Sequence, residues 1–590
     1  MKRKILTALA LSLMLCSCED YLTRLPQDTV TDTPDFWNNE KNVRSEAIGL
    51  YDHYFDGYKT GWSRSTWFAE TDIADWVDDN AQRAATFFTK VAPATGGGWD
   101  FTTLRRINVI IDRVTTNSME EEVKNHWLGV GRFFRALEYC KLVSKFGDVP
   151  YYDTVLSSTD YEKLYAPRMK RSEVMDRVLA DFKFACEHVR AQDGEPGLSV
   201  NNDVVLAYMS RAMLFEGTWQ KYREKDAQKA AEYLKAAKDA AEKIIKSGNY
   251  SLHPNYKELT TSLDLAGNKE IILYRSYVEG ELTHSLMSFQ NTEHENSSPS
   301  RSLIESYLSS NGLPIYQSGN TLYSEEKEKW FETEFADRDP RLSQIIYTDD
   351  LYLEGVKAPY AVSGYFANRF VNEDIKTLPA GTSSTNTTDA PVMKLNEVIM
   401  NYIEAAAELQ ELGQYTLTQG DVDMTINAIR DRESTHMPHL TLSGTGFSVN
   451  GTAINDPERD KDVPSLIWEI RRERRTELVY EGIRFNDLRR WSKLNYADMK
   501  LNKKLNLGAW LDKDKYIAWY NKKHPESPIT MEHLKSVTLD RSGNAGYIMP
   551  IQEEAKMRTF SEKDYLYPIP EDQITLYEQN NKPLNQNPGW

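Results

Sequence analysis

The most regular pattern in the chain is an apolar repeat with helical spacing in the segment 125–148. One stripe advances in steps of three and four residues through Trp127, Val130, Phe134 and Leu137. An adjoining stripe contains Phe133, Ala136, Cys140 and Val143. Because the two stripes cover a wide face, the pattern predicts a helix that packs on more than one neighbour. Gly147 and Pro150 are placed to end this helix.

Similar periodicity predicts further helices at 42–55, 101–115, 203–219, 226–250, 395–413 and 421–432. The last four form two pairs joined by short polar turns. The second helix of the first pair and the first helix of the second pair are rich in alanine, which lets helices approach closely. Paired helices of this kind resemble tetratricopeptide units. We therefore predict a mainly α fold, a tetratricopeptide-like helical scaffold (α-α superhelix) with large insertions.

Helical periodicity fades between Gly267 and Pro391. Gly, Ser, Asn and Thr become frequent, and only short extended runs such as 270–277 appear. The region after about residue 500 is also irregular. We predict a helical part at 18–266, a loop-rich, irregular second lobe at 267–394, and a C-terminal part at 395–590 with a helix pair followed by irregular structure. Loops on a rigid scaffold are common binding surfaces.

The segment "RRERRTELVYEGIRFNDLRRW", residues 471–491, contains seven arginines and four acids. It could be a nucleic-acid patch, an exposed charged helix or a buried structural element. Ile467 and Ile470 define an apolar seam that continues through Arg474 and Glu477, which predicts an internal ion pair between the last two. Acids recur every four residues and balance the arginines. We assign structural roles in this network to Arg474, Glu477, Glu481, Arg484 and Asp487.

Overall charge argues against a nucleic-acid partner. The 590-residue chain has a formal net charge of −17, which repels phosphate backbones. Aromatic residues make up 11% of the chain, including 13 Trp and 33 Tyr. Most of these rings should lie in the core, but any that remain exposed would suit flat ligands such as sugars or peptide side chains.

The N-terminus has the features of a targeting segment. Three cationic residues precede the short apolar run "ILTALALSLML", which is too short to span a bilayer. The following "LCSC" resembles a bacterial lipobox, which predicts a signal peptide at 1–17 and a lipid on Cys18. The alternative is an ordinary secretory peptide cleaved nearby. Cys140 and Cys186 lie in predicted helices and are interpreted as buried thiols, with no disulfide framework.

Catalytic templates are scarce in this chain. It contains no P-loop, no G-x-S-x-G and no H-E-x-x-H motif. The acidic cluster at 75–80 could in principle act as a glycosidase pair through Asp75 and Asp79. Such clusters are more often solvated or accept hydrogen bonds from sugar hydroxyls, so we predict no catalytic residues. No cofactor or metal site is predicted. Calcium could bind an acidic cluster, but there is no EF-hand loop to support it.

Several sequence blocks follow one another along the chain, from "CEDYL" and "LPQDTVTD" through "GRFFRALEYCKLVSKFGDVPYY", "NKEIILYRSY" and "SNGLPIY" to the arginine-rich segment and the ending "YPIPEDQITLYEQNNKPLNQNPGW". In this order they resemble the SusD/RagB family of nutrient-binding outer-membrane lipoproteins. The shared order over about 570 residues is far more specific than any single block. One departure is Leu395-Asn396, where the family usually has Arg-Tyr or a similar pair, and we interpret it as drift in a packing helix.

The resemblance implies a cell-surface binding protein and not an enzyme. Members of the family are lids on SusC-like TonB-dependent transporters of the outer membrane, and they deliver oligosaccharides, or peptides in the RagB branch. Glu19 and Asp20 resemble the acidic signal for surface export. We expect a lipid-anchored, surface-exposed protein that binds a glycan. A peptide ligand remains the alternative, and a glycoside hydrolase is a remote one.

Ligand contacts should combine exposed rings with polar side chains that bond to hydroxyl groups. The early stretch 61–83 has this composition, with candidates Trp62, Trp67, Asp72, Asp75, Trp76, Asp79 and Arg83. The resemblance also points to the second lobe, where the candidates are Tyr277, Phe289, Asn291 and Tyr316. The competing interpretation of each aromatic residue is core packing.

Overall fold

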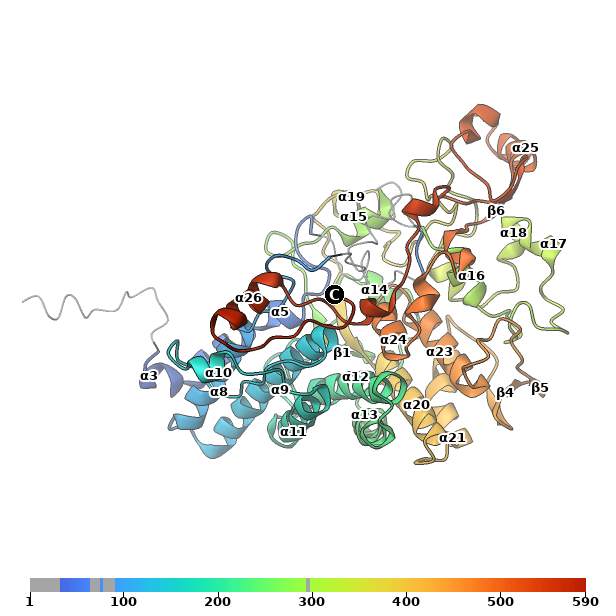
Figure 1. Ribbon diagram of the computed structural model, residues 1–590. Coiled ribbons are helices and arrows are strands. Elements are labelled where there is room, and N and C mark those ends of the chain that lie inside the picture. The colour runs from blue at the N-terminus through green and yellow to red at the C-terminus, as the bar shows by residue number, and fades with distance from the viewer. Residues whose placement is uncertain (1–31, 64–74, 78–90, 293–297) are drawn as a thin grey trace, which may run out of the picture.

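A layer of long helices forms one side of the molecule in the computed structural model, which describes residues 32–63, 75–77, 91–292 and 298–590. Figure 1 shows these helices side by side, and consecutive members contact one another. The layer contains α8 (Thr102–Thr116), α9 (Glu121–Phe146), α11 (Arg171–His188), α12 (Asn202–Trp219), α13 (Ala227–Ser247), α20 (Leu395–Glu411) and α23 (Ser465–Glu477).

The wide apolar face of α9 packs on several neighbours, as its two stripes predicted. It contacts α8, α11 and α4 (Glu40–Ile48), and nearly every residue from Trp127 to Val143 is buried or half-buried. Gly147, with a φ of 74°, ends the helix. The helix predicted at 42–55 is instead split into α4 and α5 (Tyr51–Tyr54), because the chain turns at Gly49 and Leu50.

Close approach of α12 and α13 depends on a glycine. A Cβ atom on Gly217 would lie 2.7 Å from Leu234 Cγ and 2.9 Å from its backbone nitrogen. Small residues on α13, including Ala230, Ala237 and Ala241, are fully buried in the same layer. Small side chains at this seam therefore let the two backbones pack tightly.

Strands β1 (Ile271–Arg275) and β2 (Ala390–Lys394) pair antiparallel and close the long insertion between them. β2 runs directly into α20, whose residues from Leu395 to Leu409 are all buried. The insertion thus leaves and re-enters the helical layer at one small sheet. Its short helices are α15 (Leu286–Asn291), α16 (Arg301–Ser306), α17 (Glu325–Glu328), α18 (Phe331–Glu334) and α19 (Pro379–Thr382).

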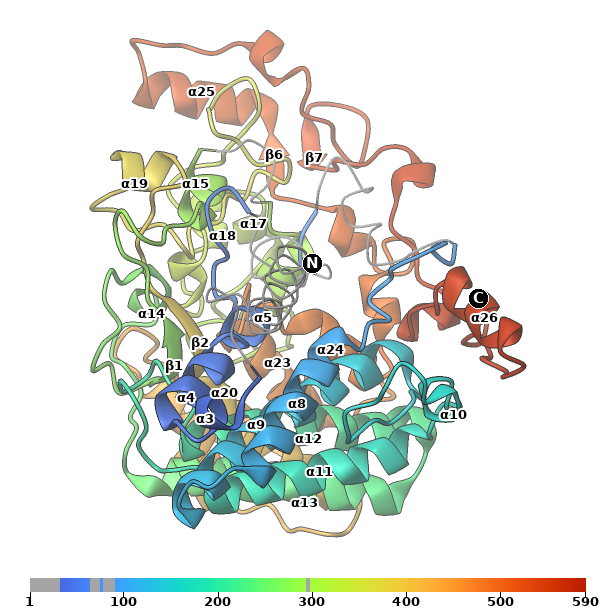
Figure 2. The ribbon, with the colours of Figure 1, turned by 90° about the vertical axis from the view of Figure 1, so that its left-hand side faces the viewer.

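A second hydrophobic core lies within these short elements and is distinct from the core of the helical layer. It contains residues from 256–390 and also from 479–548, which bring in β6 (Trp510–Asp512), β7 (Ala545–Tyr547) and α25 (Lys513–Lys523). Figures 1 and 2 show α25, β6 and α15 on the opposite side of the molecule from α11 and α13. The exact division predicted from the sequence, at 266 and 394, stays a prediction.

The remaining elements connect or cover these two parts. The short helices α3 (Pro34–Trp37), α10 (Tyr161–Leu164) and α14 (Glu258–Thr261) precede β1 along the chain, and the segment 419–430 contains α21 (Gln419–Val422) and α22 (Ala428–Arg430). A small sheet follows, made of β3 (Thr441–Ser443), β4 (Gly446–Val449) and β5 (Thr452–Ala453). The last helix after α24 (Arg484–Arg490) is α26 (Glu571–Gln579). It lies beside α10, where the Tyr577 hydroxyl donates to the carbonyl of Ala166 (3.2 Å).

In the described ranges, no helix has the length and apolar character needed to cross a membrane.

The arginine-rich segment forms a buried charge network, but its pairing differs from the prediction. Arg474 donates to Asp487 (2.8 Å) and not to Glu477. The Glu477 carboxylate accepts from Arg341 (2.9 Å) and Arg432 (2.7 Å), which come from other segments. The predicted Arg474–Glu477 pair is therefore wrong, because partners from outside the helix occupy both carboxylate oxygens. The helix that carries these residues ends at Glu477.

The other members of the network have partners of the same kind, with one exception. Glu481 pairs with Lys394 and Arg369, and Asp487 also accepts from Arg490 at 2.7 Å. Arg484 is the exception: it lines a pocket, and no carboxylate in the described ranges pairs with it.

Cys140 and Cys186 are both free thiols, and burial raises the pKa of Cys186 to about 12.

Candidate functional site

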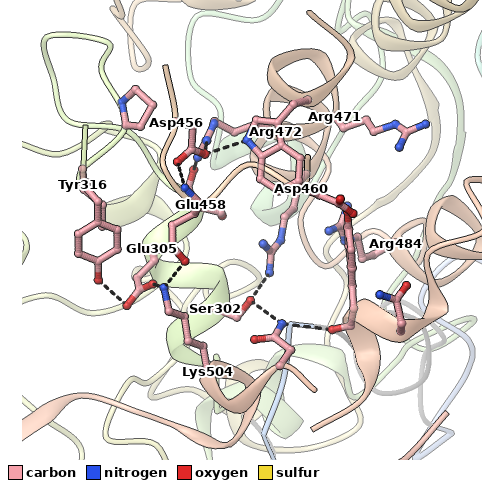
Figure 3. A pocket seen from close by; sticks show the side chains of 18 of the residues that line it. Ser302, Glu305, Tyr316, Asp456, Glu458, Asp460, Arg471, Arg472, Arg484 and Lys504 are labelled. Carbon is pink, nitrogen blue, oxygen red and sulfur yellow. Dashed lines mark hydrogen bonds and ion pairs between the residues drawn. The ribbon is translucent and has the colours of Figure 1, made fainter. Parts of the chain in front are cut away.

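A pocket of about 360 Å³ opens between α16, α23, α24 and the segment that follows α24. Its walls contain aromatic rings, side-chain amides and charged groups (Figure 3). Tyr316, a candidate from the sequence, lies on one wall and donates to Glu305 at 2.7 Å. The pocket therefore has the mixed apolar and polar lining that is typical of small-molecule sites.

Two helices present one face each to this pocket. On α16, Ser302, Glu305 and Ser306 follow at spacings of three and four residues. On α23 the lining residues are Trp468, Arg471, Arg472 and Arg475, again on one face. Ile467 and Ile470 on the same helix are fully buried in the core. The amphipathic pattern of α23 thus directs Arg471, Arg472 and Arg475 to the pocket and its isoleucines to the helical layer.

Most charges in the pocket are compensated. Arg472 pairs with Asp456 and with Glu469 (3.0 Å), and Lys504 pairs with Glu305 (2.6 Å) and Glu458 (2.7 Å). These ion pairs hold the walls in place. Because the carboxylates already accept from these cations, they offer few free acceptors to a ligand.

Asp460 stays ionised in this setting. Burial opposes its charged form, but hydrogen bonds from Lys493 and Tyr496 outweigh burial and lower the pKa of Asp460 to about 2. A carboxylate with this pKa is a poor general acid near neutral pH.

The early candidate residues separate in space. Trp62 is 55% exposed, with its ring edge-on to Phe289 at 6.0 Å between centroids. Trp76 is half-buried and packs on Tyr480 at 4.8 Å. Trp67, Asp72, Asp79 and Arg83, as well as the proposed lipid site Cys18, lie outside the described residues.

Asp75 does not have the exposed position expected of a ligand contact or a catalytic acid. It is 1% exposed and accepts from Arg475 Nε at 2.9 Å. This ion pair attaches the early segment to α23 across 400 residues of sequence. The prediction of Asp75 as a ligand contact is corrected to a structural role, because its carboxylate is already occupied.

Tyr277 and Phe289 also belong to the core. They are 3% and 9% exposed, and the Tyr277 hydroxyl donates to the carbonyl of Lys59 at 2.8 Å. The Asn291 amide donates to the carbonyls of Lys376 (2.7 Å) and Gly381 (3.0 Å), which holds α15 against the α19 region. Core packing, the competing interpretation, is therefore the better one for Tyr277 and Phe289, while Asn291 supports a loop.

Sequence reasoning missed most of the pocket. Its lining comes from 302–316, 456–475 and 484–504, and only Tyr316 and Arg484 had been singled out, Arg484 for a structural role. One available signal was the spacing of Trp468, Arg471, Arg472 and Arg475 on the side of α23 opposite the apolar seam. In the described ranges, no group of three or more His, Cys, Asp or Glu side chains is arranged to hold a metal ion.

A second pocket of similar volume lies between α9, α12 and α24. Its arginines are paired: Arg171 with Glu216 (2.6 Å) and Arg211 with Glu397 (2.6 Å). Of the described residues that the sequence marked as ligand contacts, none lines this second pocket. We therefore regard the pocket at Tyr316 as the better candidate site.

Comparison with known proteins identifies similar proteins over most of the chain. The SusD family pattern matches residues 269–590. A SusD-like protein P38 from Formosa agariphila is 24% identical over 496 residues, which cover 81% of this chain and 89% of that protein. The family resemblance inferred from the sequence blocks is confirmed.

Solved structures share the fold at low sequence identity. A SusD-like carbohydrate-binding protein from Bacteroides fragilis superposes with a TM-score of 0.62 at 22% identity, covering 93% of this chain and 99% of that one. The surface glycan-binding protein A from Bacteroides fluxus gives 0.57 at 18% identity, over 94% and 100% of the chains. A laminarin-binding SusD-like protein gives 0.54 at 18% identity, again over 94% and 100%. The prediction of a mainly α, tetratricopeptide-like fold is confirmed.

Proposed function

Because this chain belongs to the SusD family, we propose that it is a non-catalytic binding protein of the cell surface that captures an oligosaccharide in the pocket at Tyr316. The observation that carries the proposal is the lining of that pocket. Tyr316, Trp468 and Tyr496 supply ring surface, while Asn495, Asn502 and Ser302 supply neutral groups that can bond to hydroxyls. A volume of about 360 Å³ suits one or two sugar rings of a longer chain.

Several structurally similar proteins support a glycan ligand over a peptide ligand. The names of three structurally similar proteins refer to carbohydrate, glycan or laminarin binding. The glycoside hydrolase alternative is less well supported. Asp75, one of its two proposed acids, is buried and bound to Arg475. We propose that the bound glycan passes to a SusC-like TonB-dependent transporter in the outer membrane, to which the protein is anchored by a lipid on Cys18.

A glycan array with the full-length mature protein tests this function. The expected result is selective binding of one class of oligosaccharide without formation of new reducing ends. Binding only to peptides would replace the glycan proposal with the peptide alternative. Turnover of any oligosaccharide would contradict a non-catalytic role. Co-purification of a TonB-dependent transporter from detergent-solubilised outer membranes tests the partner separately.

A further inference from the structure

Arg484 differs from the arginines around it. Arg471, Arg472, Arg474, Arg475 and Arg490 each lie within ion-pair distance of a carboxylate. For Arg484, by contrast, no ion pair or hydrogen bond to any side chain in the described ranges is formed, and its Nε is buried without an acceptor. Among the described residues, its guanidinium faces the ring of Trp491, with 5.5 Å from the guanidinium carbon to the centroid.

The surroundings do not compensate this charge. Burial lowers the pKa of Arg484, and repulsion by nearby Arg475 lowers it further. The acids that attract it, Asp75 and Asp487, are already bound to Arg475 and Arg474. A half-buried guanidinium whose Nε is buried without its own carboxylate is unfavourable for folding, and an incoming anion would supply the missing partner.

Arg471 adds a second unfilled position on the same wall. Its side chain is 6% exposed and donates to Glu408 through Nη2 at 3.2 Å, but its Nε has no acceptor among the residues that the structure describes. Neutral donors lie nearby on the pocket lining, at Asn495 and Asn502. In Figure 3, Arg484 lies across the pocket from Tyr316 and Glu305. The cationic groups with unfilled donors therefore lie on the side of the pocket opposite Tyr316.

We propose that the Arg484 end of the pocket is a subsite for an oxyanion carried by the oligosaccharide, either the carboxylate of a uronic acid or a sulfate ester. Guanidinium groups bind both kinds of oxyanion with charge-assisted hydrogen bonds. The inference rests on the proposed function and narrows it to acidic glycans. The net charge of −17 does not oppose it, because a local cationic wall can dominate at contact distance.

Calorimetric titrations with matched probes test the subsite. For the carboxylate, the acidic probe is tetragalacturonate and its neutralised form is the methyl ester. For the sulfate, the acidic probe is a carrageenan tetrasaccharide and its neutralised form is the desulfated tetrasaccharide. Laminaritetraose is the neutral probe. We expect one acidic probe to bind at least tenfold more tightly than its neutralised form, with an affinity that falls as NaCl rises. The pair that shows this difference identifies the oxyanion.

Variants assign the effect to Arg484. Arg484→Gln should remove the preference for the acidic probe, and Arg484→Lys should retain part of it. Arg132→Gln is the matched control: Arg132 lies on α9 over the ring of Phe184 (3.9 Å) and its Nε also lacks an acceptor. This control should bind like the wild type. The denaturation midpoint of Arg484→Gln should stay equal or rise, which separates loss of a ligand contact from loss of the fold.

The possible failures are distinguishable. Equal binding of a probe and its neutralised form, or an acidic preference that survives in Arg484→Gln, overturns the subsite and leaves the glycan proposal standing. Tightest binding to laminaritetraose has the same consequence. Binding of no oligosaccharide, with capture of peptides that weakens on amidation of their C-terminus, overturns the glycan proposal and the acidic-glycan subsite together.

Discussion

Glu473 and Glu477 show what the arginine-rich segment does at the scale of single residues. Glu473 accepts from Arg341 and Arg430, and Glu477 accepts from Arg341 and Arg432. All five side chains are at most 2% exposed. Burying so many charges is costly, so the network stabilises the fold only while each carboxylate keeps its partners. It therefore specifies how three distant segments meet.

Removal of one arginine should expose this dependence. Arg432→Met leaves Glu270 and one oxygen of Glu477 without their guanidinium partner, both at 0% exposure. We expect a loss of about 3–5 kcal/mol in the free energy of unfolding, measured by urea denaturation. Arg541→Met, at an exposed pair with Asp540, is the control and should leave the midpoint unchanged. Equal midpoints for the two variants would contradict the account.

Acid should weaken the network through Glu473. Burial opposes its charged form, but Arg341 and Arg430 outweigh burial and lower the pKa of Glu473 from 4.5 to about 2. The unfolded chain therefore binds more protons than the folded chain below pH 4.5, and this stabilisation is lost as pH falls towards 2. Urea midpoints measured from pH 6 to pH 3 should decline. A Glu473→Gln variant should start lower and decline less steeply; an identical slope would count against this assignment.

Only part of this residue-scale picture could be predicted from the sequence. The regular alternation of acids and arginines indicated a balanced network, and the apolar seam indicated burial. The partners could not be predicted, because Arg341 and Arg432 are distant in sequence from the helix they contact. The spacing of three residues within α23 predicted an Arg474–Glu477 pair. In the structure both side chains pair with residues from other segments instead.

At the scale of elements, helical periodicity was the most informative signal. The bounds of α8, α9, α12, α13 and α20 lie within a few residues of those predicted, because each helix buries a long periodic stripe. The early helix was predicted as one piece and is two, since the tight packing of Arg106 against Gly49 and the turn at Leu50 depend on tertiary contacts. The short elements of the second lobe have too few periodic positions to be predicted one by one.

The α12–α13 contact provides a test at this scale. Gly217→Ala places a methyl group 2.7 Å from Leu234 Cγ, which should cost about 1–3 kcal/mol through overpacking. Gly420→Ala is the control, because the nearest atom to its Cβ is Thr418 Oγ1 at 3.6 Å. Thermal unfolding should show a lower Tm for the first variant only. A Gly217→Ala protein as stable as the wild type would mean that the helices can separate without loss.

At the scale of the whole molecule, the pocket joins parts of the chain that the sequence does not connect. Its lining comes from the insertion, from α23 and from the segment after α24. The ion pair between Asp75 and Arg475 also attaches the segment around residue 75 to the pocket wall. Tyr277 and Phe289, candidates chosen by residue type and by the family resemblance, lie in the core instead. Composition indicates which residue types bind sugars, but only the fold decides which of them reach solvent.

Membrane attachment belongs to this scale as well. If the lipid on Cys18 is the anchor, Cys18→Ala should move the protein from the membrane pellet to the soluble fraction of fractionated cells. Cys140→Ala is the matched control and should remain in the pellet, because Cys140 is a free thiol inside α9. Retention of both variants in the pellet would argue against lipid anchoring.

Calorimetry with an array-selected oligosaccharide can show whether the pocket at Tyr316 captures the glycan. Tyr316→Ala should weaken the affinity by about 1 kcal/mol, roughly fivefold, through loss of the ring. Tyr161→Ala removes a ring that is 59% exposed and lies on α10, which is not part of the pocket lining, and should leave the affinity unchanged. Unchanged binding by Tyr316→Ala, with weakened binding by Trp62→Ala, would contradict the account and move the site to the surface beside Phe289.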